Sequence, residues 1–140
     1  MTTGTDTFEH SLQITNVWLK DLMARLSTED RHHAYLALRT TLHALRDRLT
    51  VEEAAHLGAQ LPMLVRGLYF EGWHPAGKPR KDRTGEEFLA HLEGAARNPN
   101  FEAESAVRAV FGLLAERVSA GEIEDVKSIL PRAIRAFWPG

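Results

Sequence analysis

Glu53 and His56 have a spacing that occurs in metal sites. A Glu-x-x-His pair places two ligands on one face of a helix, as in carboxylate-bridged di-iron bundles. Such a site also needs a second Glu-x-x-His and two more glutamates. A similar later stretch begins at Glu122 and has Asp125 where the second histidine would stand. Thr50 lies three residues before Glu53, which is the spacing of a helix-capping box. We therefore interpret Glu53 as a capping residue and predict no bound metal.

Arg66 and Arg135 each lie four residues after a proline. An arginine can anchor a fold by pairing with a carboxylate through two hydrogen bonds, or it can bind an anionic ligand. Because Glu53 and Glu122 recur at the same interval as the two arginines, we predict that the arginines are buried structural anchors. Each should pair with a carboxylate or with backbone carbonyls, and the two glutamates are the first expected partners. A symmetric pair of sites for an anionic ligand is the alternative.

Aromatic and basic residues share the segment that follows Tyr69. Trp73 is followed by four basic residues between Lys78 and Arg83. This composition is found in partner surfaces and in proteins that bind single strands, and also in loops that cover a core. A tryptophan ring buries a large apolar area, whereas buried basic groups lose their hydration. We predict that Tyr69 and Trp73 pack against the protein while residues 78–83 stay solvated and mobile. A partner surface is the alternative.

Several kinds of chemistry are excluded by what the chain lacks. It has no cysteine, which rules out disulfides, thiolate metal sites and cysteine nucleophiles. It has neither a Gly-x-Ser-x-Gly elbow nor a Gly-rich phosphate loop. Its formal net charge of −2 gives no electrostatic footprint for nucleic acid. We expect no enzymatic activity, no cofactor and no nucleic-acid partner.

Apolar residues recur at steps of three and four along the chain, as they do in amphipathic helices. The small polar residues 1–6 are predicted to form a frayed arm. No segment alternates like a strand, so the predicted fold class is all-α. Pro62 is expected to break one helix after Leu61 and to open the next at its first position. The pattern predicts helices over residues 8–26, 31–49, 51–61, 62–71, 88–96 and 107–118.

The second half of the chain repeats the first at an ungapped offset of 69 positions. The offset pairs Ala34 with Ala103, Glu53 with Glu122, Pro62 with Pro131, Arg66 with Arg135, and Tyr69 with Trp138. These are core, cap and helix-breaking positions, which a chance match would not select. We predict repeats over 8–71 and 86–138 joined by a linker at 72–85. The repeats should pack on each other as one pseudo-two-fold helical bundle, a single domain over residues 1–140.

Three stretches carry a resemblance to a known family: residues 45–69, Gly72-Trp73, and the closing Leu130-Pro131 with Ile134-Arg135. In these stretches the chain resembles the bacterial family of uncharacterised proteins called domain of unknown function 2267. The resemblance implies a helical, internally duplicated prokaryotic protein. It implies no activity, because none has been assigned to the family.

The expected function follows from these observations together. No signal pattern opens the chain and no apolar run approaches the roughly 18 residues of a spanning helix, so we expect a cytoplasmic protein without a membrane partner. Our leading hypothesis is a non-enzymatic module that acts through contacts with a protein partner or with itself. The alternative is a binder of a small anionic ligand in the cleft between the repeats, at Arg66 and Arg135. A weaker alternative is a helical protein that binds a metal through carboxylates and histidine.

Overall fold

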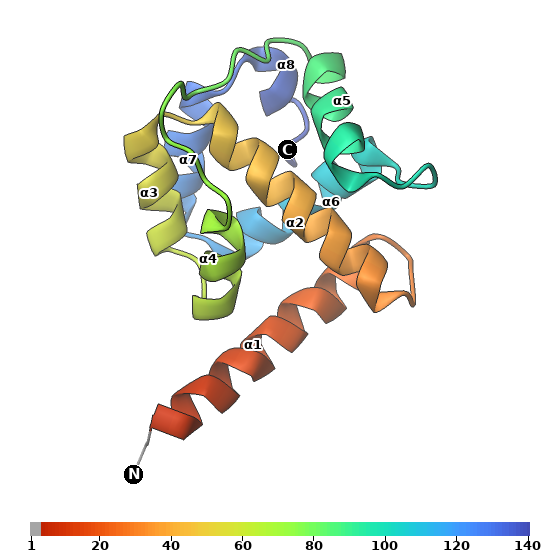
Figure 1. The fold of residues 1–140 in the computed structure, drawn as a ribbon, viewed down its shortest axis with the longest axis vertical. Coiled ribbons are helices and arrows are strands. Elements are labelled where there is room, and N and C mark those ends of the chain that lie inside the picture. Colours follow the sequence, from red (N-terminus) through yellow and green to blue (C-terminus); the bar gives the residue numbers. More distant parts are fainter. Residues whose placement is uncertain (1–3) are drawn as a thin grey trace.

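The computed structural model describes residues 4–140, and the described chain is built from eight α-helices without a strand (Figure 1). The predicted all-α fold is confirmed. The helices are α1 (Gly4–Arg25), α2 (Arg31–Arg48), α3 (Val51–Ala59), α4 (Met63–Phe70), α5 (Gly85–Ala96), α6 (Ala103–Arg117), α7 (Ala120–Ile129) and α8 (Arg132–Arg135).

Side-chain oxygens cap four of these helices at their N-termini. Asp30 accepts a hydrogen bond from a backbone N–H in the first turn of α2, and Thr50, Thr84 and Ser119 do the same for α3, α5 and α7. Each cap satisfies a donor that has no partner within its helix. The caps explain why the predicted helix starts at residues 31 and 51 are confirmed.

Pro62 breaks the chain between α3 and α4, as predicted, but its position in α4 differs from the prediction. Pro62 is the N-cap of α4 with ψ of 156°, and Pro131 is the N-cap of α8 with ψ of 151°. Both prolines are therefore extended, and α4 begins one residue later than expected. A proline fits this place because its missing N–H would have no helical partner there.

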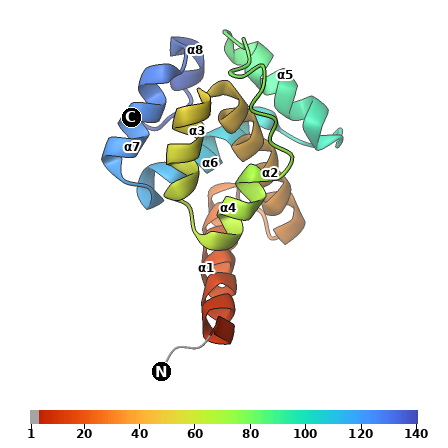
Figure 2. The same cartoon turned by 60° about the vertical axis from the view of Figure 1, so that its left-hand side comes forward.

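Helix α1 begins earlier than predicted and buries only its second half. It starts at Gly4, so residues 4–6 are helical, and the rest of the predicted frayed arm lies outside the described residues. The N-terminal half projects from the body of the molecule (Figure 2). Phe8 and Leu12, which we expected on the buried face, are 68% and 56% exposed, whereas Trp18 and Leu22 are buried.

Helices α2 and α6 cross at the centre of the molecule and carry much of the core. The 69-residue offset relates α2 to α6 and α3 to α7, and the two members of each pair pack against each other. Helix α1 also packs on α6, as α5 does on α2. A pseudo-two-fold axis would give this pattern, in which helices of one half pack on the other half. The duplication itself stays a prediction.

The segment between α4 and α5 is held against the C-terminal end of α2. The backbone N–H of Arg80 donates to the Asp47 carbonyl at 2.8 Å, and Arg48 Nε donates to the Asp82 carbonyl at 2.7 Å. The side chains of Arg80, Lys81 and Arg83 are exposed, as predicted, but Asp82 is buried. The prediction of a solvated segment thus holds for these three basic side chains, whereas Lys78 is half-buried and the two backbone anchors were not foreseen.

None of the helices in residues 4–140 combines the length and the apolar character that crossing a membrane requires.

Candidate functional site

The N-termini of α3 and α7 place two glutamates at the contact between these helices. Thr50 accepts a hydrogen bond from the Glu53 N–H at 3.1 Å, and Ser119 accepts one from the Glu122 N–H at 3.3 Å. Each cap fixes a glutamate in the first turn of its helix. Because α3 and α7 lie side by side, the two first turns bring their glutamates to the same place (Figures 1 and 2).

Three carboxylates meet there. Glu53, Glu122 and Asp125 each offer an oxygen that lies within 4.8 Å of the other two. Glu53 is 9% exposed and Glu122 is 8% exposed. The Oε2 atom of each is buried and has no hydrogen-bond partner in the described part of the chain. A buried polar atom without a partner costs stability, so this arrangement requires a physical explanation.

The predicted capping role of the Glu53 carboxylate is wrong. In a complete capping box that carboxylate accepts a hydrogen bond from the backbone N–H of the cap residue. The Thr50 hydroxyl makes its half of the motif, but no N–H among residues 4–140 donates to the Glu53 side chain. The carboxylate points instead toward α7. The main reason for discounting Glu53 as a ligand is thereby removed.

Like charges dominate the cluster. Burial is the largest of the causes that together raise the pKa of Glu122 from its ordinary value to about 8, and the neighbouring Glu53 and Asp125 carboxylates contribute to the same rise. Within residues 4–140 no lysine or arginine forms an ion pair with any of the three acids. The nearest group able to carry a positive charge is the His56 ring, whose Nδ1 lies 3.9 Å from Glu53 Oε2.

The ligand types in this cluster are those of a divalent cation site. Helix α3 offers Glu53 and His56, and α7 offers Glu122 and Asp125 at the same spacing. Metal–oxygen distances of roughly 2.0–2.6 Å place the ligand oxygens of one ion within about 5 Å of each other. Asp125, which stands where we expected a second histidine, also belongs to a residue type that binds metals. The three carboxylates therefore fit one cation, with the His56 ring beside Glu53, and in its absence a proton held by Glu122 lowers the repulsion.

The predicted burial of Arg66 and Arg135 is wrong, since both side chains are exposed. Arg66 donates to the carbonyls of Gly58 at 3.1 Å and Leu61 at 2.9 Å, so backbone carbonyls rather than Glu53 are its partners. Glu53 lies in the first turn of α3, whereas these carbonyls lie at its other end, where a cation interacts favourably with the helix dipole. The side chain of Arg135 has no hydrogen bond or ion pair within the described chain.

Tyr69 and Trp73 pack against the core, as predicted. Tyr69 is fully buried and donates its hydroxyl to the Ala54 carbonyl at 2.7 Å. Burial raises the pKa of this phenol above its ordinary value. Trp73 is half-buried, and its ring centroid lies 5.4 Å from that of Phe70. These contacts are structural, and they leave little of either ring for a partner.

Arg46 has the role of a buried structural anchor that we predicted for Arg66. It is 4% exposed, and Nη1 donates to the carbonyls of Tyr69 at 2.8 Å and Glu71 at 2.9 Å. Its Nε donates to Asp47 at 2.8 Å. The repeat offered no signal for this residue, because the 69-residue offset pairs Arg46 with Ala115.

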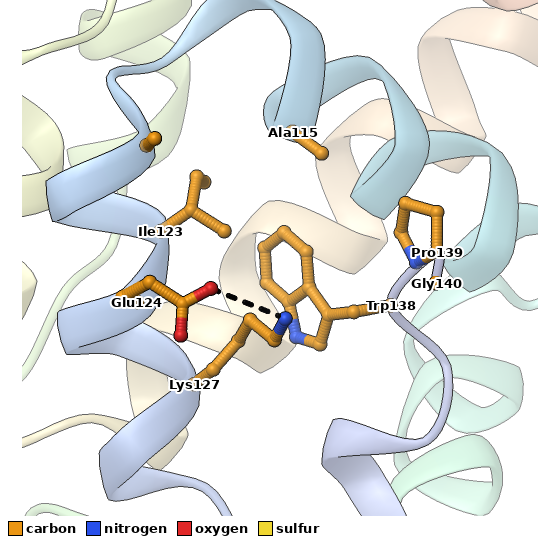
Figure 3. Close-up of a pocket in the computed structure, with 8 residues that line it drawn as sticks. Ala115, Ile123, Glu124, Lys127, Trp138, Pro139 and Gly140 are labelled. Carbon is orange, nitrogen blue, oxygen red and sulfur yellow. Dashed lines mark hydrogen bonds and ion pairs between the residues drawn. The ribbon is translucent and has the colours of Figure 1, made fainter.

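The second half has a cavity beside the position that corresponds to Arg46. A space of about 290 Å³ adjoins Ala115 and Trp138. Figure 3 shows the Trp138 ring between Ala115 and the ion pair of Glu124 with Lys127, whose atoms are 3.5 Å apart. Glu124 and Lys127, the charged residues that line this cavity, form an ion pair with each other. We therefore regard the cavity as a packing difference between the halves and not as a binding site.

The model of the family described as "Uncharacterized conserved protein (DUF2267)" matches residues 15–137. That range contains the whole acidic cluster and all the helices from α2 to α8. A search of the curated proteins found no match.

Proposed function

Because the chain belongs to the DUF2267 family, which is described as uncharacterized, we propose a function from its own geometry. The protein is a non-enzymatic helical module that binds a divalent metal cation between α3 and α7. The observation that supports this proposal is the meeting of Glu53 and Glu122, buried with unpartnered oxygens and with no basic counter-ion. Burying an ion costs several kcal/mol unless a compensating charge accompanies it. A divalent cation supplies that charge.

The ligand set favours a transition-metal ion such as Mn²⁺ or Zn²⁺. Carboxylates suit Mg²⁺, Ca²⁺ and Mn²⁺, whereas imidazole suits Zn²⁺ and other transition metals. Four protein ligands are fewer than the six to eight oxygens that Ca²⁺ takes. His56 is mostly exposed, and its ring lies too far from Glu53 for a hydrogen bond. It is therefore free to serve as the fourth ligand.

The same residues support binding without catalysis. If Glu53, Glu122, Asp125 and His56 all bind the cation, none of them remains as a general acid or base. A reaction at a metal also needs an open coordination position beside a shaped substrate cavity. The cavity described beside Trp138 has a different lining. These points support the expected absence of enzymatic activity.

Titration calorimetry with Mn²⁺ and with Zn²⁺ tests the proposal. We expect one ion per chain and an affinity that rises with pH through about 8, because the proton on Glu122 must leave before the metal binds. Glu122→Gln should weaken binding by at least about tenfold, since even an outer partner of a metal ligand is worth that much. Glu124→Gln is the matched control, an exposed acid on the same helix outside the cluster.

Two results would overturn the cation site. One is that neither ion binds stoichiometrically at a pH above the Glu122 pKa of about 8. The other is equal weakening by Glu122→Gln and Glu124→Gln, which would indicate attraction by the general acidity of α7. Circular dichroism of both variants shows that they retain the helical fold.

Contact with a protein partner or with a second copy is the second candidate function. The observation that favours it is the exposure of Phe8 and Leu12 on the projecting half of α1. The exposed Met63 of α4 adjoins them, because its sulfur lies 3.7 Å from Ser11 Oγ. Contiguous exposed apolar side chains are typical of contact surfaces.

A further inference from the structure

A cavity of about 490 Å³ lies between α2 of the first half and α5 of the second. It shares no residue with the acidic cluster. The charged and titratable residues that line it are Arg39, His43, Arg46, Asp47, His91 and Arg97. Three guanidinium groups thus stand against one carboxylate. This is a cleft between the predicted repeats, where we expected an anionic ligand, but its arginines are not Arg66 and Arg135.

Two of the three guanidinium groups are available to a ligand. Arg46 is fully engaged, because it pairs with Asp47 and donates to the carbonyls of Tyr69 and Glu71. That pairing also neutralises the only carboxylate in the lining. The side chain of Arg97 has no hydrogen bond or ion pair within residues 4–140, and that of Arg39 has only a 3.5 Å ion pair with the exposed Glu71. The positive charges of Arg39 and Arg97 are therefore nearly uncompensated.

His43 contributes an imidazole that is positioned by the backbone. Its Nε2 lies 2.7 Å from the Leu68 carbonyl and therefore donates to it, which leaves Nδ1 as the second ring nitrogen. Burial lowers the pKa of His43, and the charges of Arg46 and Arg39 lower it further, while the hydrogen bond to the Leu68 carbonyl and the charge of Asp47 oppose this change. The ring is thus neutral at neutral pH while the cavity holds no anion.

His91 lies on the opposite wall of the cavity, on α5. Its Nδ1 lies 4.0 Å from Asp82 Oδ2, in the segment that is held against α2. Burial and the nearby Arg80 lower the pKa of His91, Lys78 adds to this effect, and Asp82 and Asp47 oppose it. An anion between the two rings would favour their protonated forms, in which the ring nitrogens not already engaged also donate hydrogen bonds.

We infer that this cavity binds a small molecule through a doubly charged oxyanion, a phosphate monoester or inorganic phosphate, held by Arg39 and Arg97 with His43 and His91 as further donors. The planar guanidinium fork matches the oxygens of phosphate. Two uncompensated arginines match two negative charges. The volume lies in the range of small-molecule sites.

Calorimetry with inorganic phosphate, glycerol phosphate and acetate tests the inference. We expect both phosphates to bind at one site per chain and acetate to bind at least about tenfold more weakly, because it has half their charge. Arg97→Gln and Arg39→Gln should each weaken phosphate binding by about tenfold or more. Arg83→Gln is the control, an exposed arginine outside the cavity. Arg97 is itself exposed and unpartnered, so its substitution should leave the fold intact.

The proton linkage gives a second readout. Phosphate should raise the pKa of His43 and His91 in an NMR titration carried out with the Arg83→Gln control alongside. Absence of phosphate binding, or equal weakening by Arg97→Gln and Arg83→Gln, would overturn the inference. Acetate binding as tight as phosphate would overturn the assignment of a dianion. Measurements in the presence of a chelator keep this outcome separate from that of the cation site.

Discussion

Glu122 makes the stability of the protein depend on pH in an unusual direction. Its pKa rises from an ordinary value of 4.5 to about 8 in the folded chain. Between these values the folded protein holds a proton that the unfolded chain has released. Stability therefore falls as pH rises through this range, and the full cost is present above about pH 8. His43 and His91, with lowered pKa values, act oppositely and cost stability as pH falls below 6.5.

Glu122→Gln isolates the contribution of this carboxyl group. At about pH 9 and without metal the variant should unfold with a free energy roughly 1–3 kcal/mol higher than that of the parent, because one of two like charges is removed from a buried site. At about pH 5, where Glu122 is already protonated, the two proteins should be nearly equal. Urea denaturation at both pH values measures the difference, with Glu124→Gln as the control. A difference that does not change with pH would contradict the raised pKa.

At the scale of the element, the corner between α3 and α4 depends on one close approach. A Cβ at Gly58 would collide with the Phe70 ring and lie 3.0 Å from Cε2 of Tyr69. Phe70 is half-buried and has some freedom to move. Tyr69 has none, because it is fully buried and hydrogen-bonded to Ala54. The missing side chain thus lets α4 pack against the last turns of α3.

Gly58→Ala should destabilise the protein by roughly 1–3 kcal/mol, because overpacking at the corner outweighs the better helix propensity of alanine. Gly67→Ala is the matched control in α4, where an added Cβ meets nothing within 4 Å. It should be stabilising by about 0.5–1 kcal/mol. Thermal unfolding followed by circular dichroism compares the two. A Gly58→Ala protein as stable as Gly67→Ala would show that the corner rearranges freely.

Six of the eight described helices were predicted from the sequence and α7 and α8 were not among the predicted ranges, whereas the candidate sites were predictable only in part. Periodicity and caps act within a few residues, so the pattern alone predicts α2 and α3 closely. Glu53 and Glu122 are 69 positions apart, and only the predicted repeat indicated that they could be in contact. Residues related by a two-fold axis meet where a helix packs on its own counterpart. Arg46 binds carbonyls that tertiary packing brings to it, and no local pattern reports such a contact.

At the scale of the whole molecule, the projecting half of α1 predicts self-association. Phe8 and Leu12 are exposed there beside Met63, and apolar surface in water is stabilised by mutual burial. Sedimentation velocity across a wide concentration range should show association that Leu12→Ser weakens by about tenfold or more, as burial of a leucine is worth roughly 1.5–3 kcal/mol. Val17→Ser is the control, exposed on another face of α1. A monomer at every concentration would contradict the prediction.

The two backbone anchors of the segment between α4 and α5 change how the halves are joined. A free linker contributes closure entropy that depends weakly on its length, about 0.6 kcal/mol for each doubling. Here the chain is held to α2 at Arg80 and Asp82, and α5 begins at Gly85. Extra residues inserted before Arg80 would extend a surface loop at little cost. Insertions between Asp82 and Gly85 would displace α5 itself. They would therefore change the width of the cleft that α5 forms with α2.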